Sequence, residues 1–244
     1  MARKFDLVLF DLGDTLMYFD GVYLEILEQA NQHLFQALVE AGYRLDPGEF
    51  IPAFRTHLQA YYRQRDVDFI EHTVESVLRA TLTEAGYPNI PPEHVRAALG
   101  RMYAFTHSFW RREEDALPTL VELKRLGYRL GLISNAADAN DVRDMIRQHE
   151  LEPWLEQVLI SAEVKQRKPH PAIYQQALYF FGVPAERAVM VGDKLNVDVV
   201  GAQNAGLTGI WIARRAHRTH ENTIQADATI ETLAELPSLL ENWK

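Results

Sequence analysis

Short apolar runs recur along the chain and predict the strands of a buried sheet. Residues 5–10 (FDLVLF) form the first run, and a long gap separates it from the next. The later runs are residues 128–134, 157–161, 188–192, 208–213 and 226–230. Continuous apolar runs of this length, rich in strand-forming residues, are typical of parallel strands that are covered on both faces.

Helical patterns alternate with these runs in the second half of the chain. We expect helices over residues 116–126, 137–149, 170–181 and 197–205. Strands that alternate with helices indicate βαβ units, in which helices cover both faces of a parallel sheet. The sequence therefore predicts an α/β fold with a Rossmann-like, doubly wound parallel sheet at its core.

The segment 17–111 has a different pattern and contains no convincing strand run. Apolar residues recur at helical spacing in three stretches, which are residues 24–41, 69–85 and 95–105. We therefore predict that an all-helical segment, residues 17–111, is inserted after the first strand. The α/β core is then formed by residues 1–16 and 112–244.

Composition and charge exclude several classes of protein. The chain has 244 residues and no cysteine, which excludes disulfides, thiolate zinc sites and a cysteine nucleophile. The formal net charge of −9 disfavours nucleic-acid binding, and Arg214, Arg215 and Arg218 are the only basic cluster. No run approaches the roughly 20 apolar residues that cross a membrane. We expect a cytoplasmic monomer or homodimer with neither nucleic-acid nor membrane partners.

Polar residues stand where the predicted strands end. In open α/β sheets, ligands bind at the carboxyl ends of the strands. The residues at those ends are Asp11, Ser134 with Asn135, Lys168, and Asp193 followed by Asp198. A carboxylate such as Asp11 can attack phosphorus, and Asp11 and Asp193 supply the oxygen ligands that Mg²⁺ prefers. Lys168 and Ser134 can bind phosphoryl oxygens, while Asp198 can orient Lys168 or support the metal.

These motifs resemble those of the haloacid dehalogenase-like hydrolase superfamily. The similarity lies in FDLGDTL at 10–16, LISN at 132–135, KPHPAIY at 168–174 and VGDKLNVDVVGAQNAGL at 191–207. The order of the four motifs carries the resemblance, since each motif alone is weak. It implies a Mg²⁺-dependent phosphatase, which cleaves a small phosphorylated metabolite through an aspartyl-phosphate. It also implies that the helical segment 17–111 is a mobile cap domain and that residues 1–16 and 112–244 are the catalytic core.

The resemblance also implies a role for each residue. Asp11 is the nucleophile. Asp11, the Gly13 carbonyl and Asp193 hold the metal, with Asp198 beside them. The phosphate is bound by Ser134, Asn135 and Lys168.

Gly13 departs from the usual pattern of the family's phosphatases. Those enzymes carry a second aspartate two residues after the nucleophile, where it protonates the leaving oxygen. General acid–base catalysis contributes about 10²–10⁴-fold to a rate. Asp14 lies one residue further along, and the sequence leaves open whether it replaces the missing acid.

Three alternatives follow from these observations. A weakly active relative that binds a phosphometabolite or a protein partner is favoured by Gly13. A dehalogenase is disfavoured, because its first motif resembles Asp-x-Tyr and it lacks the metal-binding acids. A phosphonatase needs a cap lysine, and segment 17–111 contains none.

The inserted segment also carries a group of aromatic and basic residues, Tyr61, Tyr62, Arg63 and Arg65. These side chains can bind an anionic substrate from the cap, but the pattern favours a solvated helix end.

Overall fold

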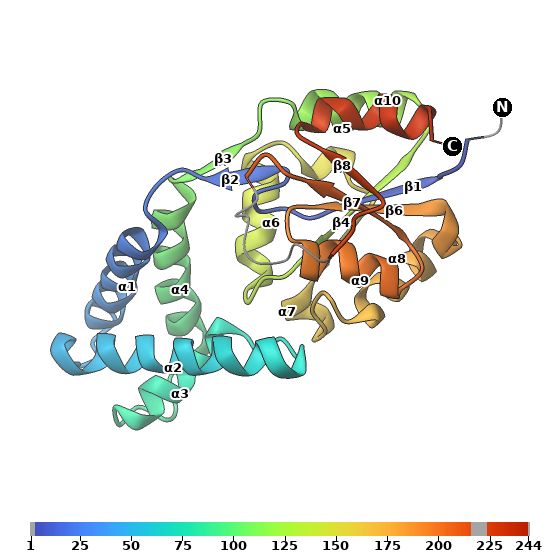
Figure 1. Cartoon of the computed structure of the whole chain (residues 1–244). Helices are drawn as coiled ribbons and strands as arrows, with labels where there is room; N and C mark the ends of the chain where they lie inside the picture. The colour runs from blue at the N-terminus through green and yellow to red at the C-terminus, as the bar shows by residue number, and fades with distance from the viewer. Residues whose placement is uncertain (1–2, 216–223, 244) are drawn as a thin grey trace.

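The computed structural model describes residues 3–215 and 224–243, so that Arg218 lies outside the described part. A parallel sheet forms its centre, in the order β5-β4-β1-β6-β7-β8 (Figure 1). The strands are β1 Leu7–Phe10, β4 Arg129–Ser134, β5 Gln157–Ile160, β6 Ala188–Gly192, β7 Thr208–Ile212 and β8 Ala228–Ile230. Each of these six strands falls within a predicted apolar run, and the predicted α/β, Rossmann-like fold is confirmed.

The strand order changes direction at β1. Phe10 pairs with Leu132 of β4 on one side and with Val191 of β6 on the other. The chain first adds β4 and β5 on one side of β1 and then crosses to β6 on the other. Loops diverge at such a switch point and leave a crevice at the carboxyl ends of the strands.

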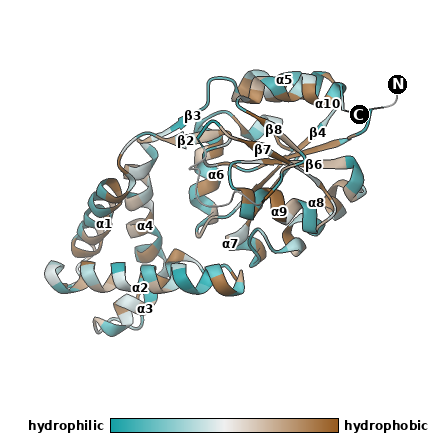
Figure 2. Ribbon diagram, viewed as in Figure 1, coloured by the Kyte–Doolittle hydropathy of each residue, from teal (hydrophilic) through white to brown (hydrophobic). Residues whose placement is uncertain are grey.

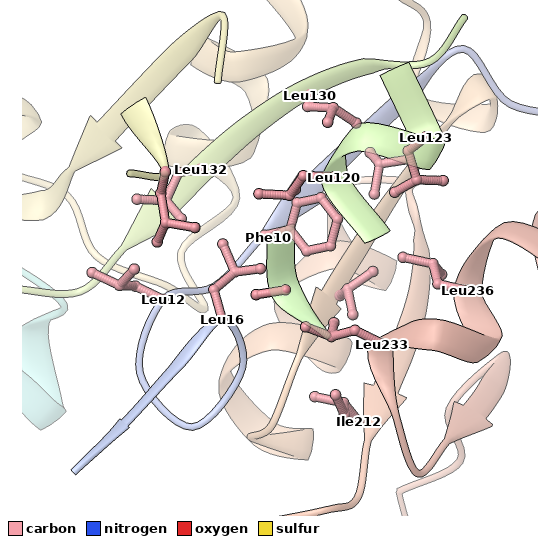
Figure 3. Close-up of a cluster of buried hydrophobic side chains, with 14 of the residues drawn as sticks. Phe10, Leu12, Leu16, Leu120, Leu123, Leu130, Leu132, Ile212, Leu233 and Leu236 are labelled. Atoms are coloured by element: carbon pink, nitrogen blue, oxygen red, sulfur yellow. The ribbon is translucent and has the colours of Figure 1, made fainter. Parts of the chain in front are cut away.

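Helices cover both faces of the sheet. The helices of the core are α5 Ala116–Arg125, α6 Ala139–Gln148, α7 Ser161–Val164, α8 Pro171–Phe181, α9 Val200–Asn204 and α10 Leu236–Glu241. Short 3₁₀ turns span Glu152–Trp154, Ala185–Arg187 and Leu233–Glu235. On one face, Phe10 packs against Leu120, Leu123 and Leu236 from α5 and α10 (Figure 3). On the other face, α8 and α9 pack on the sheet, whose strands are largely apolar (Figure 2).

The inserted segment has an apolar cluster of its own. Its helices are α1 Tyr23–Glu40, α2 Pro47–Asp68, α3 Val74–Glu84 and α4 Pro92–His107. Buried side chains from all four helices, among them Leu34, Phe54, Leu78 and Leu99, form this cluster. The four helices lie to one side of the sheet, with α1 beside α4 (Figure 1). Within the described residues, no helix has the length and apolarity needed to cross a membrane.

Two details of segment 17–111 differ from the sequence prediction. The expectation that it lacks strands is wrong, because β2 Met17–Phe19 and β3 Trp110–Arg112 form a small antiparallel sheet. Three-residue strands are too short to give a recognisable pattern. Helix α2 was not predicted, and Phe69, the expected start of the next helix, instead ends α2 with a left-handed φ of 54°.

Candidate active site

The ends of β1 and β6 bring together the three carboxylates that the sequence singled out. The Asp11 N–H donates to the carbonyl of Val191 (2.9 Å), which fixes the end of β1 against β6. Ligand oxygens of Asp11, Asp193 and Asp198 all lie within 4.8 Å of one another. The Trp211 indole N–H donates to the Asp193 carbonyl (2.8 Å) and holds this backbone in place.

Lys168 lies between two of these carboxylates. Its Nζ is 2.5 Å from Asp11 Oδ1 and 2.7 Å from Asp198 Oδ1, and the side chain is almost fully buried. Burial opposes its charge, but the charges of Asp11 and Asp198 prevail and raise the pKa of Lys168. The ammonium group is therefore protonated and fixed beside the Asp11 carboxylate.

The side chain of Asn135 orients the backbone of Lys168. Its Nδ2 donates to the Lys168 carbonyl (2.9 Å), and its Oδ1 accepts from the Lys168 N–H (2.8 Å). Ser134 precedes it at the end of β4, and both residues line the same cavity as Asp11. This paired contact joins the second and third motifs, which lie far apart in the sequence.

Close packing behind Asp198 explains the glycine in VGD. A Cβ atom at Gly192 would lie 2.3 Å from Asp198 Cγ, so no side chain fits there. A turn of π-helix, Leu195–Val199, carries Asp198, and its Oδ2 accepts from the Lys194 N–H (3.0 Å). The motif therefore buries one carboxylate directly against the β6 backbone.

The electrostatics of this cluster favour a bound cation. Burial, together with the charge of Asp11, raises the pKa of Asp193 to about 8, and burial also raises the pKa of Asp198. Asp193 Oδ1 is buried and has no hydrogen-bond partner among the described residues. Hard divalent cations prefer carboxylate and carbonyl oxygens, so this set of ligands fits a metal such as Mg²⁺.

Lys194 is a charged group at this site that our sequence analysis did not single out. It lines the cavity next to Asp193. Burial opposes its charge, but Asp193, Asp11 and Asp198 raise its pKa. The signal was present in the sequence, because Lys194 directly follows a predicted metal ligand.

A cavity of about 570 Å³ opens in front of these residues, between the sheet and the inserted helices. The core contributes Asp11, Ser134 and Lys168, whereas the insert contributes Tyr23, Tyr62, Arg65, Tyr103 and Trp110. Arg63 is exposed, as expected of a solvated helix end. For Tyr62 and Arg65 that expectation is wrong, because both line the cavity.

Gly13 lies beneath an aromatic ring. A Cβ atom at Gly13 would lie 3.4 Å from Trp110 Cη2, which is an ordinary contact distance. Asp14 also lines the cavity and has a left-handed φ of 58°. The indole of Trp110 therefore covers the position from which the second aspartate of the family's phosphatases extends.

The insert is fastened to the core beside this cavity. Glu71, in the α2–α3 connection, accepts from Ser161 Oγ and from Arg167 Nη1, each at 2.5 Å. The Tyr61 hydroxyl also donates to Glu71. The backbone adds a hydrogen bond from the Glu71 N–H to the Lys165 carbonyl (3.2 Å).

Two further side-chain pairs link α4 to the first turn of α6. Arg96 Nη2 lies 2.8 Å from Asp138 Oδ2, and His107 Nε2 lies 2.5 Å from Asp141 Oδ1. The insert thus contacts the core on two sides of the cavity.

Comparisons with known proteins agree with this geometry. The sequence model of a family described as haloacid dehalogenase-like hydrolase matches residues 5–206. The chain is 30% identical over 243 residues to a glyceraldehyde 3-phosphate phosphatase of Pyrococcus furiosus, covering 98% of this chain and 93% of that protein. Both matches include the insert.

Solved structures show the same architecture. A HAD phosphatase from Thermococcus onnurineus superposes with a TM-score of 0.68 at 26% identity, covering 96% of this chain and 97% of that one. A 2-haloacid dehalogenase from Pseudomonas syringae gives a TM-score of 0.70 at 24% identity, covering 98% and 100%. The second likeness concerns the fold alone.

Proposed function

Because the chain belongs to the haloacid dehalogenase-like hydrolases, we propose that it is a Mg²⁺-dependent phosphatase of a small phosphomonoester. One observation carries the proposal. Lys168 Nζ forms ion pairs with both Asp11 and Asp198, and a carboxylate oxygen of Asp193 lies within 4.8 Å of the oxygens of these two residues. This arrangement presents a carboxylate nucleophile, a fixed cation and ligands for a metal at one edge of the sheet.

Asp11 performs the chemical step in this proposal. One of its carboxylate oxygens attacks phosphorus, the bond from phosphorus to the ester oxygen breaks, and the alcohol leaves with a proton from solvent. Water then attacks the aspartyl-phosphate, releases inorganic phosphate and restores the Asp11 carboxylate. Lys168 and Ser134 bind the phosphoryl oxygens, and Asn135 keeps Lys168 in position.

The metal ligands in this proposal are Asp11, the Gly13 carbonyl and Asp193, with Asp198 beside them. Bound Mg²⁺ supplies positive charge that offsets the repulsion between the Asp11 carboxylate and the anionic phosphate. Asp198 forms an ion pair with Lys168 and accepts a hydrogen bond from the Lys194 N–H, so its role here is to orient Lys168. The assignment of Asp193 as a metal ligand is supported by its buried Oδ1, which has no hydrogen-bond partner among the described residues.

We assign residues 17–111 to the cap and residues 1–16 and 112–244 to the catalytic core. Support comes from the separate apolar cluster of the insert and from the β2–β3 sheet that connects it. Closure of a cap over a core excludes bulk water from the reacting groups. Glyceraldehyde 3-phosphate, named for the Pyrococcus relative, is one candidate substrate of the size that this cavity accepts.

The test uses p-nitrophenyl phosphate with Mg²⁺, with EDTA and with Asp11→Asn. We expect turnover that needs Mg²⁺ and falls by more than about a thousandfold in the variant, because the nucleophile is lost. The exposed acid Asp20 provides a matched control, and Asp20→Asn is expected to retain activity. Mass spectrometry of acid-quenched wild type is expected to show one added phosphoryl group that Asp11→Asn lacks.

A second readout tests the metal independently of turnover. A ligand that binds only the folded protein raises its melting temperature. We expect Mg²⁺ to raise the melting temperature of the wild type but not that of Asp193→Asn. Turnover that is unaffected by EDTA, or that survives Asp11→Asn, would contradict the proposal.

A further inference from the structure

We propose that Arg65 binds a carboxylate on the substrate, so that the enzyme prefers phosphomonoesters that carry a carboxylic acid. The inference rests on the proposed phosphatase function, since it concerns the far end of the same cavity. It goes beyond that function by naming the second anionic group and the residue that selects it. It also distinguishes this chain from a phosphatase of a neutral aldehyde.

Arg65 is a partly buried cation that makes no direct hydrogen bond among the described residues. Its side chain lies on the cavity wall and is 22% exposed. Its Nε is buried without a partner, and its guanidinium lies 4.2 Å from the ring centre of Tyr62. The closest carboxylate oxygens are Glu71 Oε1 at 3.7 Å and Asp66 Oδ1 at 3.9 Å, both beyond hydrogen-bond range.

The neighbouring acids do not neutralise Arg65. Glu71 already accepts hydrogen bonds from Arg167, Ser161 and Tyr61, so its charge is matched by Arg167. Asp66 is 70% exposed, and water screens its charge. Arg65 therefore has only long ion-pair contacts to these acids, and its N–H donors remain available on the cavity wall.

Three tyrosines accompany Arg65 on the same wall. Tyr23, Tyr62 and Tyr103 line the cavity, and burial raises the pKa of Tyr62 and Tyr103. Their hydroxyl groups therefore remain protonated at neutral pH and can donate hydrogen bonds. Tyr23 and Tyr62 both lie within electrostatic range of Arg65. Together these donors form an anion site on the insert, facing the proposed phosphate site on the core.

The charge and shape of this site favour a carboxylate over a second phosphate. A guanidinium offers parallel N–H donors that match the two oxygens of one carboxylate. A second phosphate carries nearly two negative charges at neutral pH, and Arg65 supplies only one positive charge because Arg167 is engaged by Glu71.

The first test compares 3-phosphoglycerate with glyceraldehyde 3-phosphate, using the full-length protein with Mg²⁺. The two compounds share their carbon skeleton and phosphate and differ only in a carboxylate or an aldehyde at carbon 1. We expect kcat/KM to be at least about tenfold higher for the acid, which is the effect of one charge-assisted contact. Arg65→Gln is expected to abolish this preference, because kcat/KM for the acid falls by about tenfold while kcat/KM for the aldehyde falls much less.

Arg63→Gln is the matched control, because it removes the same charge from the same helix at an exposed position. We expect it to retain the preference for the acid. Arg65→Lys keeps the charge but not the paired donors, and we expect an intermediate preference.

A binding measurement separates recognition from turnover. In the Asp11→Asn background, calorimetry gives the Kd of 3-phosphoglycerate without hydrolysis. Adding Arg65→Gln is expected to raise this Kd by about tenfold and to leave the Kd of inorganic phosphate unchanged.

The outcomes distinguish this inference from the proposed function. If the wild type does not hydrolyse p-nitrophenyl phosphate, the phosphatase function is refuted, and the inference that rests on it is refuted as well. A wild type that hydrolyses it but treats acid and aldehyde alike refutes the inference alone. Equal losses on all three substrates in Arg65→Gln, with a lower melting temperature, show a structural role and also refute it.

Discussion

At the scale of single residues, Gly13 distinguishes this site from that of the family's usual phosphatases. The proposed nucleophile Asp11, Lys168 and the carboxylates proposed to bind the metal lie together, but no side chain extends from position 13 to protonate the leaving group. Trp110 covers the glycine with an aromatic ring instead. The proposed enzyme must therefore depend strongly on how well the leaving oxygen carries negative charge.

We expect aryl phosphates to be hydrolysed about 10²–10⁴-fold faster than alkyl phosphates, because a poor leaving group needs a general acid. Gly13→Asp is expected to reduce this difference, chiefly by raising the alkyl rate. A Cβ atom at position 13 would make only an ordinary contact with Trp110, so the first atom of the new side chain fits. A plot of log kcat/KM against leaving-group pKa measures the effect.

Gly13→Ala is the matched control, because it adds the Cβ atom without the carboxylate. It should keep the steep dependence on the leaving group. Wild-type rates that are similar for alkyl and aryl phosphates would show that another group, such as Asp14, already supplies the proton.

Residues that follow buried strands were easier to predict than residues that act from the insert. Asp11 and Asp193 directly follow β1 and β6. An apolar run followed at once by an acidic residue was therefore enough to identify them. Arg65 lies on α2, whose pattern of exposed and buried positions is weak. Its side chain reaches the cavity through tertiary packing, which no local pattern records.

At the scale of elements, the α2–α3 connection is the joint between insert and core. Its backbone forms an antiparallel bridge between Ile70 and Gln166, and Glu71 lies buried beneath it. The carboxylate of Glu71 is the only negative charge within direct hydrogen-bond reach of Arg167 among the described residues. The Glu71–Arg167 ion pair is therefore a buried contact that helps to dock the insert on the core.

Glu71→Gln is expected to lower the free energy of unfolding by about 3 kcal/mol, because it leaves the Arg167 charge buried without its partner. Urea unfolding followed by circular dichroism measures the loss. The double variant Glu71→Gln with Arg167→Gln should lose much less than the sum of the single variants. Additive losses would show that the pair does not act as a unit.

Elements with long, regular patterns were predicted, and short or irregular ones were not. The apolar run at 188–192 matches β6 in both bounds. Helix α2 was missed because its apolar residues are interrupted by Pro52 and by a polar second half. The β2–β3 sheet was missed because its pairing of Phe19 with Trp110 joins segments far apart in sequence.

At the scale of the whole molecule, the core and the insert have separate apolar interiors. The two clusters that cover the faces of the sheet contain no residue between Phe19 and Trp110. The third cluster is formed by the inserted helices, with Ala137 as its contact from the core. A change in periodicity at residues 17 and 111 predicts an inserted helical domain, but no local pattern predicts how the insert docks.

A core without the insert is therefore expected to fold. Replacing residues 20–109 by Asn-Gly joins Phe19 to Trp110, which already face each other across β2 and β3, with a two-residue hairpin turn. Arg167 would lose Glu71 but gain water, so no buried charge remains unpaired. We expect a single cooperative thermal transition in the shortened protein.

The activity of this shortened protein tests whether the core carries phosphoryl transfer and the insert carries substrate selection. Its groups for phosphoryl transfer all remain, so Mg²⁺-dependent hydrolysis of p-nitrophenyl phosphate should persist, about 10–100-fold slower because the substrate is less well positioned. The preference for 3-phosphoglycerate should vanish with Arg65. Asp11→Asn in the same background must abolish the remaining rate. A shortened protein that folds but keeps the preference would place substrate selection in the core, since only the core would then remain to recognise the carboxylate.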